Sequence, residues 1–180
     1  MTQYWFIAVN VAFFLAVVTS EAAQKVGDKE IAFVEKAARE QLGEIALGRL
    51  AMKKASDKKV KELGAEIVED HQYASEELKE VSAQEEIYLP VEMDAQQKKT
   101  YQRLSRLSGN EFDRAFVAYL LKKHRKDMDE LRNHAAKLRN ENVRQWAETT
   151  EPIMAVHLNK AEYVADALGM SEAKSAAASK

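Results

Sequence analysis

Histidine is the most informative residue type in this sequence, because the chain has only four and three of them share one pattern. Each of the three follows an apolar residue by four positions: His71 after Ile67, His124 after Leu120 and His157 after Ile153. Residues four apart lie on the same face of a helix, so each ring is expected to point inward with its apolar neighbour. Imidazole nitrogens bind divalent transition metals, and three inward rings are therefore candidates for a metal cage.

Several carboxylates lie close enough in sequence to take part in such a cage. Glu40 and Glu44 border the apolar stripe of an earlier segment, and we expect Glu44 to be the fourth metal ligand. Asp70 precedes His71, and Asp127 follows His124 by three residues, so both are candidates either to be extra metal ligands or to orient the rings by hydrogen bonding. The chain has no cysteine, which leaves only histidine and carboxylate ligands, and zinc or iron is the expected metal.

A metal-free interpretation stays open from the sequence alone. A buried network of histidines and carboxylates would show the same spacing, and so would inward positions without a common purpose. Three other features are weaker candidates. Asp113 either points inward or forms a capping pair with Asn110, and the capping pair is the more common arrangement. Residues 122–126 form a basic cluster that is either a solvated face or a lipid- or partner-binding patch, and His134 is expected to be exposed.

Long helices must position these residues. Apolar spacing predicts helices at roughly 28–54, 57–85, 94–107, 111–138 and 142–168. The expected N-terminal caps are Ser56, Asp94 together with Gln97, and Asn110, and Pro152 should kink or restart the last helix. Two helix pairs joined by a long connection predict an all-α fold, a ferritin-like four-helix bundle with one long crossover over residues 28–168, followed by a flexible tail at 169–180.

Composition agrees with one helical domain. The 180 residues are 46% hydrophobic and 31% charged, with 6 Gly and 2 Pro, which is too few turn residues for an all-β chain. The absence of cysteine excludes disulfide scaffolds, zinc fingers, iron–sulfur sites and thiol catalysis. A net charge of −2 gives no general attraction for nucleic acid, so no nucleic-acid partner is expected.

Residues 1–22 form a separate N-terminal hydrophobic helix in this interpretation. From Tyr4 to Val18 the only polar residue is Asn10. Such a run is either a cleaved signal peptide or a retained transmembrane anchor. Both alternatives place the following domain in the periplasm or on the extracytoplasmic face of a bacterial membrane, and a retained segment would make the membrane itself a partner.

Four segments, in order, resemble a known bacterial family: FVEKAAREQLGEIALGRLA, VKELGAEIVEDHQYASEELKEV, LSGNEFDRAFVAYLLKKH and EPIMAVHLNKAEYV. The family is the domain of unknown function numbered forty-one forty-two, often labelled "predicted outer membrane protein". The resemblance spans residues 30–166 and implies a ferritin-like fold and export to the periplasm. The family's recurrent polar positions correspond here to Glu44, Asp70-His71, Phe112-Asp113, His124 and His157. The resemblance implies no particular reaction.

The sequence departs from di-iron ferritins at the residues that matter most. Those proteins carry Glu-x-x-His motifs, but the residues three before the inward histidines are Val68, Leu121 and Met154. A site for two bridged irons is therefore not expected, and a single metal or none fits better.

Three functions follow as hypotheses. The first is a non-enzymatic extracytoplasmic bundle that binds one divalent metal. The second is a structural accessory subunit of a larger membrane protein complex, anchored by its N-terminal helix. The third is a metal-dependent oxidase or hydrolase. No phosphate-binding glycine loop, serine nucleophile elbow or His-Glu-x-x-His motif occurs, which favours a non-enzymatic role.

Overall fold

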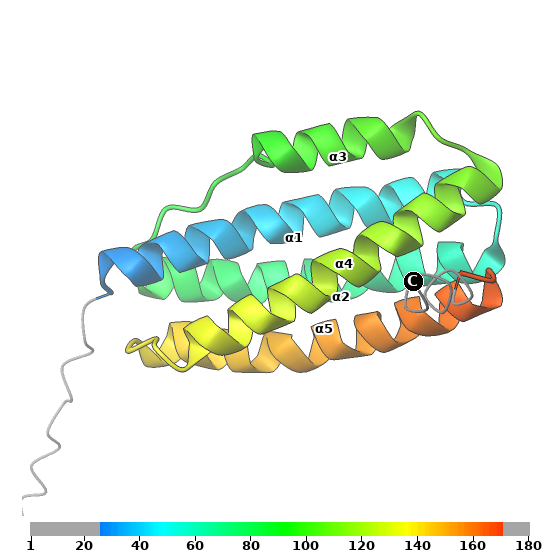
Figure 1. Ribbon diagram of the computed structural model, residues 1–180. Helices are drawn as coiled ribbons and strands as arrows, with labels where there is room; N and C mark the ends of the chain where they lie inside the picture. Colours follow the sequence, from blue (N-terminus) through cyan, green and yellow to red (C-terminus); the bar gives the residue numbers. More distant parts are fainter. Residues whose placement is uncertain (1–25, 171–180) are drawn as a thin grey trace, which may run out of the picture.

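Five helices account for most of residues 26–170, the part of the chain that the computed structural model describes (Figure 1). They are α1 (Asp28–Lys54), α2 (Lys58–Gln84), α3 (Ala95–Ser105), α4 (Gly109–Ala135) and α5 (Glu141–Ala167). No strand occurs among these residues, which confirms the predicted all-α class. The predicted segment 1–22 and residues 171–180 of the predicted tail lie outside the described residues. Within 26–170, no helix combines the length and the apolar character needed to cross a membrane.

The helix ends agree with the predicted segments to within a few residues, but two predicted caps are wrong. Asp57, not Ser56, caps α2, and its carboxylate accepts from the Lys59 and Val60 amides. Ser56 is not free to cap, because its amide and hydroxyl both donate to the Asp113 carboxylate. That contact also replaces the predicted pairing of Asp113 with Asn110.

Helix α4 begins at Gly109, two residues earlier than predicted, and Ser108 rather than Asn110 is the residue before it. The predicted capping box of Asp94 and Gln97 is confirmed at α3. Helix α5 is continuous through Pro152, so it does not restart there. Proline in a helix removes one hydrogen bond, but this helix has buried residues on both sides of Pro152, from Val143 to Ala165.

The long helices form a bundle in which α1 packs against α2, α4 against α5, and α2 against α5 (Figure 1). Helix α3 lies against α1 within the long connection from α2 to α4. The tightest approach is between α1 and α2, where a Cβ atom on Gly48 would stand only 2.6 Å from the Gly64 carbonyl oxygen. Glycine at both positions therefore lets the two backbones touch.

The core consists of two apolar clusters. One, here called the Phe112 cluster, holds Leu47, Leu50, Ala51, Val60, Leu63, Ile67, Phe112, Phe116, Val117, Leu120, Ala161 and Val164 among others. The other, the Trp146 cluster, holds Val34, Ala37, Ala38, Ala74, Leu78, Met128, Leu131, Val143, Trp146, Ala147 and Met154 among others.

A layer of buried polar residues separates the two clusters at the middle of the long helices. Its members are Gln41 and Glu44 on α1, His71 on α2, His124 on α4 and His157 on α5. Each is 4% exposed or less, although burying a polar group is costly unless its hydrogen bonds are satisfied. This polar layer is therefore the place in the core that stability alone does not explain.

Candidate metal centre

The helices bring the three inward histidines together, as the spacing predicted. On α2, His71 stands between Ile67 of the Phe112 cluster and Ala74 of the Trp146 cluster. His124 and His157 occupy the equivalent boundary on α4 and α5. The ring centroids are 6.2 Å apart for His71 and His124, 5.3 Å for His71 and His157, and 5.5 Å for His124 and His157.

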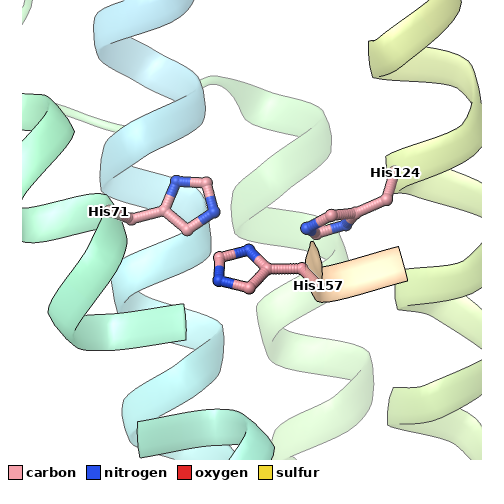
Figure 2. A group of neighbouring side chains, drawn as sticks. All are labelled: His71, His124 and His157. Carbon is pink, nitrogen blue, oxygen red and sulfur yellow. The ribbon is translucent and has the colours of Figure 1, made fainter. Parts of the chain in front are cut away.

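One nitrogen of each ring faces the space between the rings (Figure 2). One donor atom from each of the three residues can be chosen so that all lie within 4.8 Å of one another. Ligands at about 2.0–2.1 Å from a tetrahedral zinc stand about 3.3 Å apart. The rings are thus arranged around a common point, and a modest inward movement would bring them to coordination distance.

Hydrogen bonds on the outer side of two rings fix which nitrogen is free. His71 Nδ1 lies 2.7 Å from Gln41 Oε1, so the ring donates there and its Nε2 keeps a lone pair. His157 Nε2 lies 2.9 Å from Asp70 Oδ2, so that ring donates to the carboxylate and its Nδ1 keeps a lone pair. Metal-binding histidines are oriented in this way by a partner on the opposite nitrogen.

The inner nitrogens have no hydrogen-bond partner. His71 Nε2, His157 Nδ1 and both nitrogens of His124 are buried and unpaired. The Leu120 carbonyl, one turn before His124, raises the pKa of that ring but does not meet hydrogen-bonding geometry. Buried polar atoms without partners are rare in folded proteins and call for an explanation such as a ligand or ion.

The electrostatics keep the three rings neutral, which is the form that binds a metal. Burial lowers the pKa of His124 to about 3, and the neighbouring His157 and Lys123 add to this effect. Burial also holds the pKa of His71 well below its usual value, with further lowering from the other two rings. For His157, burial lowers the pKa and the hydrogen bond to Asp70 only partly offsets it.

Three neutral imidazoles fit a divalent transition metal. Nitrogen ligands suit zinc, iron and copper, and three protein ligands leave at least one coordination position open. The absence of thiolates and of a carboxylate in this inner group makes the site a weaker one than a closed structural zinc site. The residues present therefore fit a single metal ion with an exchangeable ligand.

The predicted fourth ligand, Glu44, is not part of the group of close donors. It is buried in the same layer but belongs to a charged group with Lys123, which pairs with Glu40 at 2.5 Å and also with Asp127. Burial raises the pKa of Glu44 to about 7, although Lys123 pulls it down. Burial lowers the pKa of Lys123, but the effect of three nearby carboxyl groups is larger. The net result is a raised pKa for Lys123, caused by Glu44, Asp127 and Glu40.

The two predicted orienting carboxylates have different places from those expected. Asp70 does orient a ring, but the ring is His157 on α5 rather than its sequence neighbour His71. Asp127 has no hydrogen bond to a histidine and pairs instead with Lys123 one turn earlier, because i, i+4 side chains on α4 meet on the same face. The basic residues at 122–126 do not form one patch, because they pair with acidic residues on different faces of α4. Arg125 pairs with Glu162 on α5, and Lys126 pairs with Glu130 on α4 itself.

Gln41 is the residue that the sequence did not single out. It is 4% exposed and holds His71 in its orientation. Its position in the apolar stripe of α1, between Ala38 and Ile45, is the sequence feature that could have identified it as a buried polar residue. His134, predicted to be exposed, is indeed exposed, and its ring stacks on Phe33 with centroids 6.1 Å apart.

Comparisons with known proteins give a family and a fold. A family described as "Domain of unknown function (DUF4142)" matches residues 16–164. No curated protein matches this chain. Among solved structures, a chain described as the "Crystal structure of DUF305 fragment from Deinococcus radiodurans" is similar, with a TM-score of 0.66 and 13% identity over 81% of this chain and 99% of that one. At that identity the likeness concerns the fold alone. Because the family match covers most of the sequence, the chain belongs to the DUF4142 family of domains of unknown function.

Proposed function

We propose that this protein is a ferritin-like four-helix bundle that binds one divalent transition metal ion, zinc or iron, through His71, His124 and His157. The single observation that carries the proposal is the set of buried inner nitrogens without partners in all three rings. Two of those rings are held from outside by Gln41 and Asp70, which leaves a lone pair on the inner nitrogen.

A metal-free hydrogen-bond network is the main competing interpretation. Such a network would pair the ring nitrogens with one another or with carboxylates, because unpaired polar atoms in a low-dielectric core are costly. Here His124 has no partner on either nitrogen, and no carboxylate joins the inner group. A bound ion would satisfy three of these nitrogens at once, which favours the metal.

The proposed role is binding rather than turnover, in a protein exported to the periplasm. The location and the membrane partner depend on residues 1–22, and both stay predictions. The second hypothesis, an accessory subunit of a membrane complex, depends on the same segment. Sequencing the N-terminus of the native protein would separate the alternatives, since a chain beginning near Ala23 has lost its anchor.

Titration of the metal-free full chain with Co²⁺ tests the site directly. Cobalt in a nitrogen-rich tetrahedral site gives visible absorption, so the bands should grow to one equivalent and then stop. Replacing His124 with Asn should remove most of the absorption, whereas the same change at the exposed His134 should leave it unaltered. Equal spectra for the two variants would contradict the proposal.

One observation favours a metal-dependent oxidase as a second candidate: three ligands leave a coordination position open. An iron-loaded protein with this activity should consume oxygen together with an oxidisable substrate. An oxygen electrode measurement in which iron-loaded protein and the His124→Asn variant give the same rate would count against it.

A further inference from the structure

A pocket of about 370 Å³ opens between α1, α4 and α5, on the Trp146 side of the polar layer. Most of its wall is apolar and comes from Phe33, Ala37, Leu131, Trp146 and Met154. Its volume is in the range of small-molecule sites. The wall includes an aromatic edge-to-face pair, since the rings of Phe33 and Trp146 lie 6.2 Å apart at 70°. A flat or aliphatic molecule would be well matched to this surface.

The polar part of the wall contains groups of the polar layer. Gln41, Glu44 and His71 all line the pocket. The Gln41 and His71 side chains bond to each other, but Glu44 Oε2 is buried and has no partner. Glu44 is only 3% exposed, so water does not satisfy this oxygen from the bulk solvent. A buried carboxyl oxygen without a partner, beside a mostly apolar wall, is a position where a hydrogen-bond donor on a ligand would be stabilising.

The charges around the pocket favour a cationic donor. Four carboxylates line it, at Glu40, Glu44, Asp127 and Glu130, against the two ammonium groups of Lys29 and Lys36. Lys36 pairs with Glu130, and Lys123, which does not line the pocket, pairs with both Glu40 and Asp127. After these pairings are counted, Glu44 is the pocket carboxyl group that has no salt bridge, because the nearby Lys123 lowers its pKa but forms its salt bridges with Glu40 and Asp127. Lys29 stands at the exposed N-terminal end of α1.

We propose that this pocket binds a small apolar amine, whose hydrocarbon body packs against Phe33, Leu131 and Trp146 and whose ammonium group donates to Glu44. The inference goes beyond metal binding and does not require it, because Glu44 is not among the close ring donors. It assigns Glu44 a ligand-binding role instead of the metal-binding role expected from the sequence. A charge-assisted hydrogen bond in a buried site supplies the specificity, and the apolar wall supplies most of the affinity.

Three matched probes test the inference on the full chain: 2-phenylethylamine, 2-phenylethanol and phenylacetate. They share an aromatic ring and differ mainly in the polar end. Trp5 and Trp146 are the only tryptophans, so the Trp5→Phe variant makes fluorescence report on the pocket wall alone. Calorimetry gives the affinities independently. We expect the amine to bind about tenfold or more tightly than the alcohol, and phenylacetate to bind weakest.

Two variants and one control locate the effect. Glu44→Gln keeps the shape of the side chain and should remove the amine's advantage while leaving the alcohol's affinity nearly unchanged. Ala37→Leu should fill the pocket and weaken both probes. Glu111→Gln, at an exposed carboxylate on α4 outside the pocket, should change nothing. Because Glu44→Gln is nearly isosteric, it keeps the test decisive even if Ala37→Leu disturbs folding.

Each other outcome overturns the proposal. Equal affinity for amine and alcohol would remove the role of charge, and an amine preference that survives Glu44→Gln would place the cation elsewhere. No binding of any probe would mean that the pocket has a different occupant, such as a lipid or a segment of protein. The titrations are run on metal-free and on zinc-loaded protein, because binding only to the zinc form would make the amine a metal ligand rather than a partner of Glu44.

Discussion

The middle of this bundle and its two ends are built from the same four long helices, with opposite chemistry. The Phe112 and Trp146 clusters are apolar, and their side chains need only contact one another. The polar layer between them holds three imidazoles and a carboxyl group that burial penalises. A core designed for stability alone would have apolar residues there, so the layer is evidence of a binding role.

The two ends also differ from each other. In the Phe112 cluster α1 and α2 touch through Gly48 and Gly64, and Phe112 and Phe116 stack with centroids 5.6 Å apart. The Trp146 cluster borders the pocket between α1, α4 and α5. One end of the bundle is thus closely packed, and the other leaves room for a ligand beside the polar layer.

The largest expected effect is a dependence of the free energy of unfolding on pH, which comes from the polar layer and not from the two apolar clusters. The folded pKa values of the three histidines lie below the unfolded value of 6.5, so the unfolded chain binds protons that the metal-free folded chain does not. The contribution of the neutral rings to the free energy of unfolding is therefore fully present above pH 6.5 and decreases as the pH falls. For His124, whose folded pKa is about 3, the loss between pH 7 and pH 4 is about 3 kcal/mol from this ring alone, and the other two rings add to it. Urea unfolding between pH 7 and pH 4 measures it.

His124→Asn is the matched variant for this test, because it removes the titrating ring and should flatten the dependence on pH. Protonation of Glu44 opposes the trend but is smaller than the effect of three rings. A free energy of unfolding that does not fall between pH 6.5 and pH 4 would show that the rings are not buried as neutral groups.

The second prediction compares the two apolar clusters by one leucine-to-alanine substitution in each. Leu63→Ala in the Phe112 cluster leaves a closed cavity, and we expect a loss of about 4 kcal/mol. Leu131→Ala enlarges the existing pocket, so water can enter and the loss should be about 2 kcal/mol. Equilibrium unfolding in urea gives both values. Equal losses would mean that the Trp146 side is as tightly packed as the Phe112 side.

The third prediction concerns Glu44, whose pKa is raised from 4.5 to about 7. A raised acid pKa means that the folded state binds a proton that the unfolded state has released. The contribution of Glu44 to the free energy of unfolding is therefore fully present below pH 4.5. It is lost as the pH rises through 7, and the loss is up to about 3 kcal/mol. Glu44→Gln should therefore become more stable than the native protein as the pH rises over this range. A constant difference between the two proteins would contradict the burial of an ionisable Glu44.

The smallest effect tests the close approach of α1 and α2. Gly48→Ala places a methyl group 2.6 Å from the Gly64 carbonyl oxygen, so the helices must separate, at a cost of about 2 kcal/mol. At Gly43 the added methyl meets only the side chain of Gln97. The Gln97 amide is hydrogen-bonded to Asp94 and to the Arg39 carbonyl, but it needs to shift by only a few tenths of an ångström, and the better helix propensity of alanine offsets part of the cost. Thermal unfolding of the two variants should separate them, and similar values would show that the contact is not tight.

Much of this arrangement could be predicted from the sequence, since apolar spacing located the long helices and the three inward rings. The partners of those rings could not, because they come from other helices. Asp70 orients His157, 87 residues away, and Gln41 orients His71 across the α1–α2 interface. Sequence distance suggested Asp70 with His71 and Asp127 with His124. The relative rotation and height of packed helices decided otherwise.

The placement of Glu44 shows the same limit. Helical periodicity put it in the polar layer, but whether it faces the rings or Lys123 depends on the packing of α4 against α1. The pocket is likewise a property of helix separation, which no single helix encodes. Ser56 does not cap α2 for a similar reason. The Asp113 carboxylate on α4 accepts hydrogen bonds from the Ser56 amide and hydroxyl in the α1–α2 turn.

The metal content of the full chain, purified without chelators, tests the central claim most directly. We predict about one zinc or iron per chain, and less than about a tenth of that in a variant with His71, His124 and His157 all changed to Ala. His134→Ala, at the exposed histidine, is the control and should keep the full amount. A folded native protein with only traces of metal, or metal content that is the same in the triple variant, would contradict the claim that the polar layer is a metal centre.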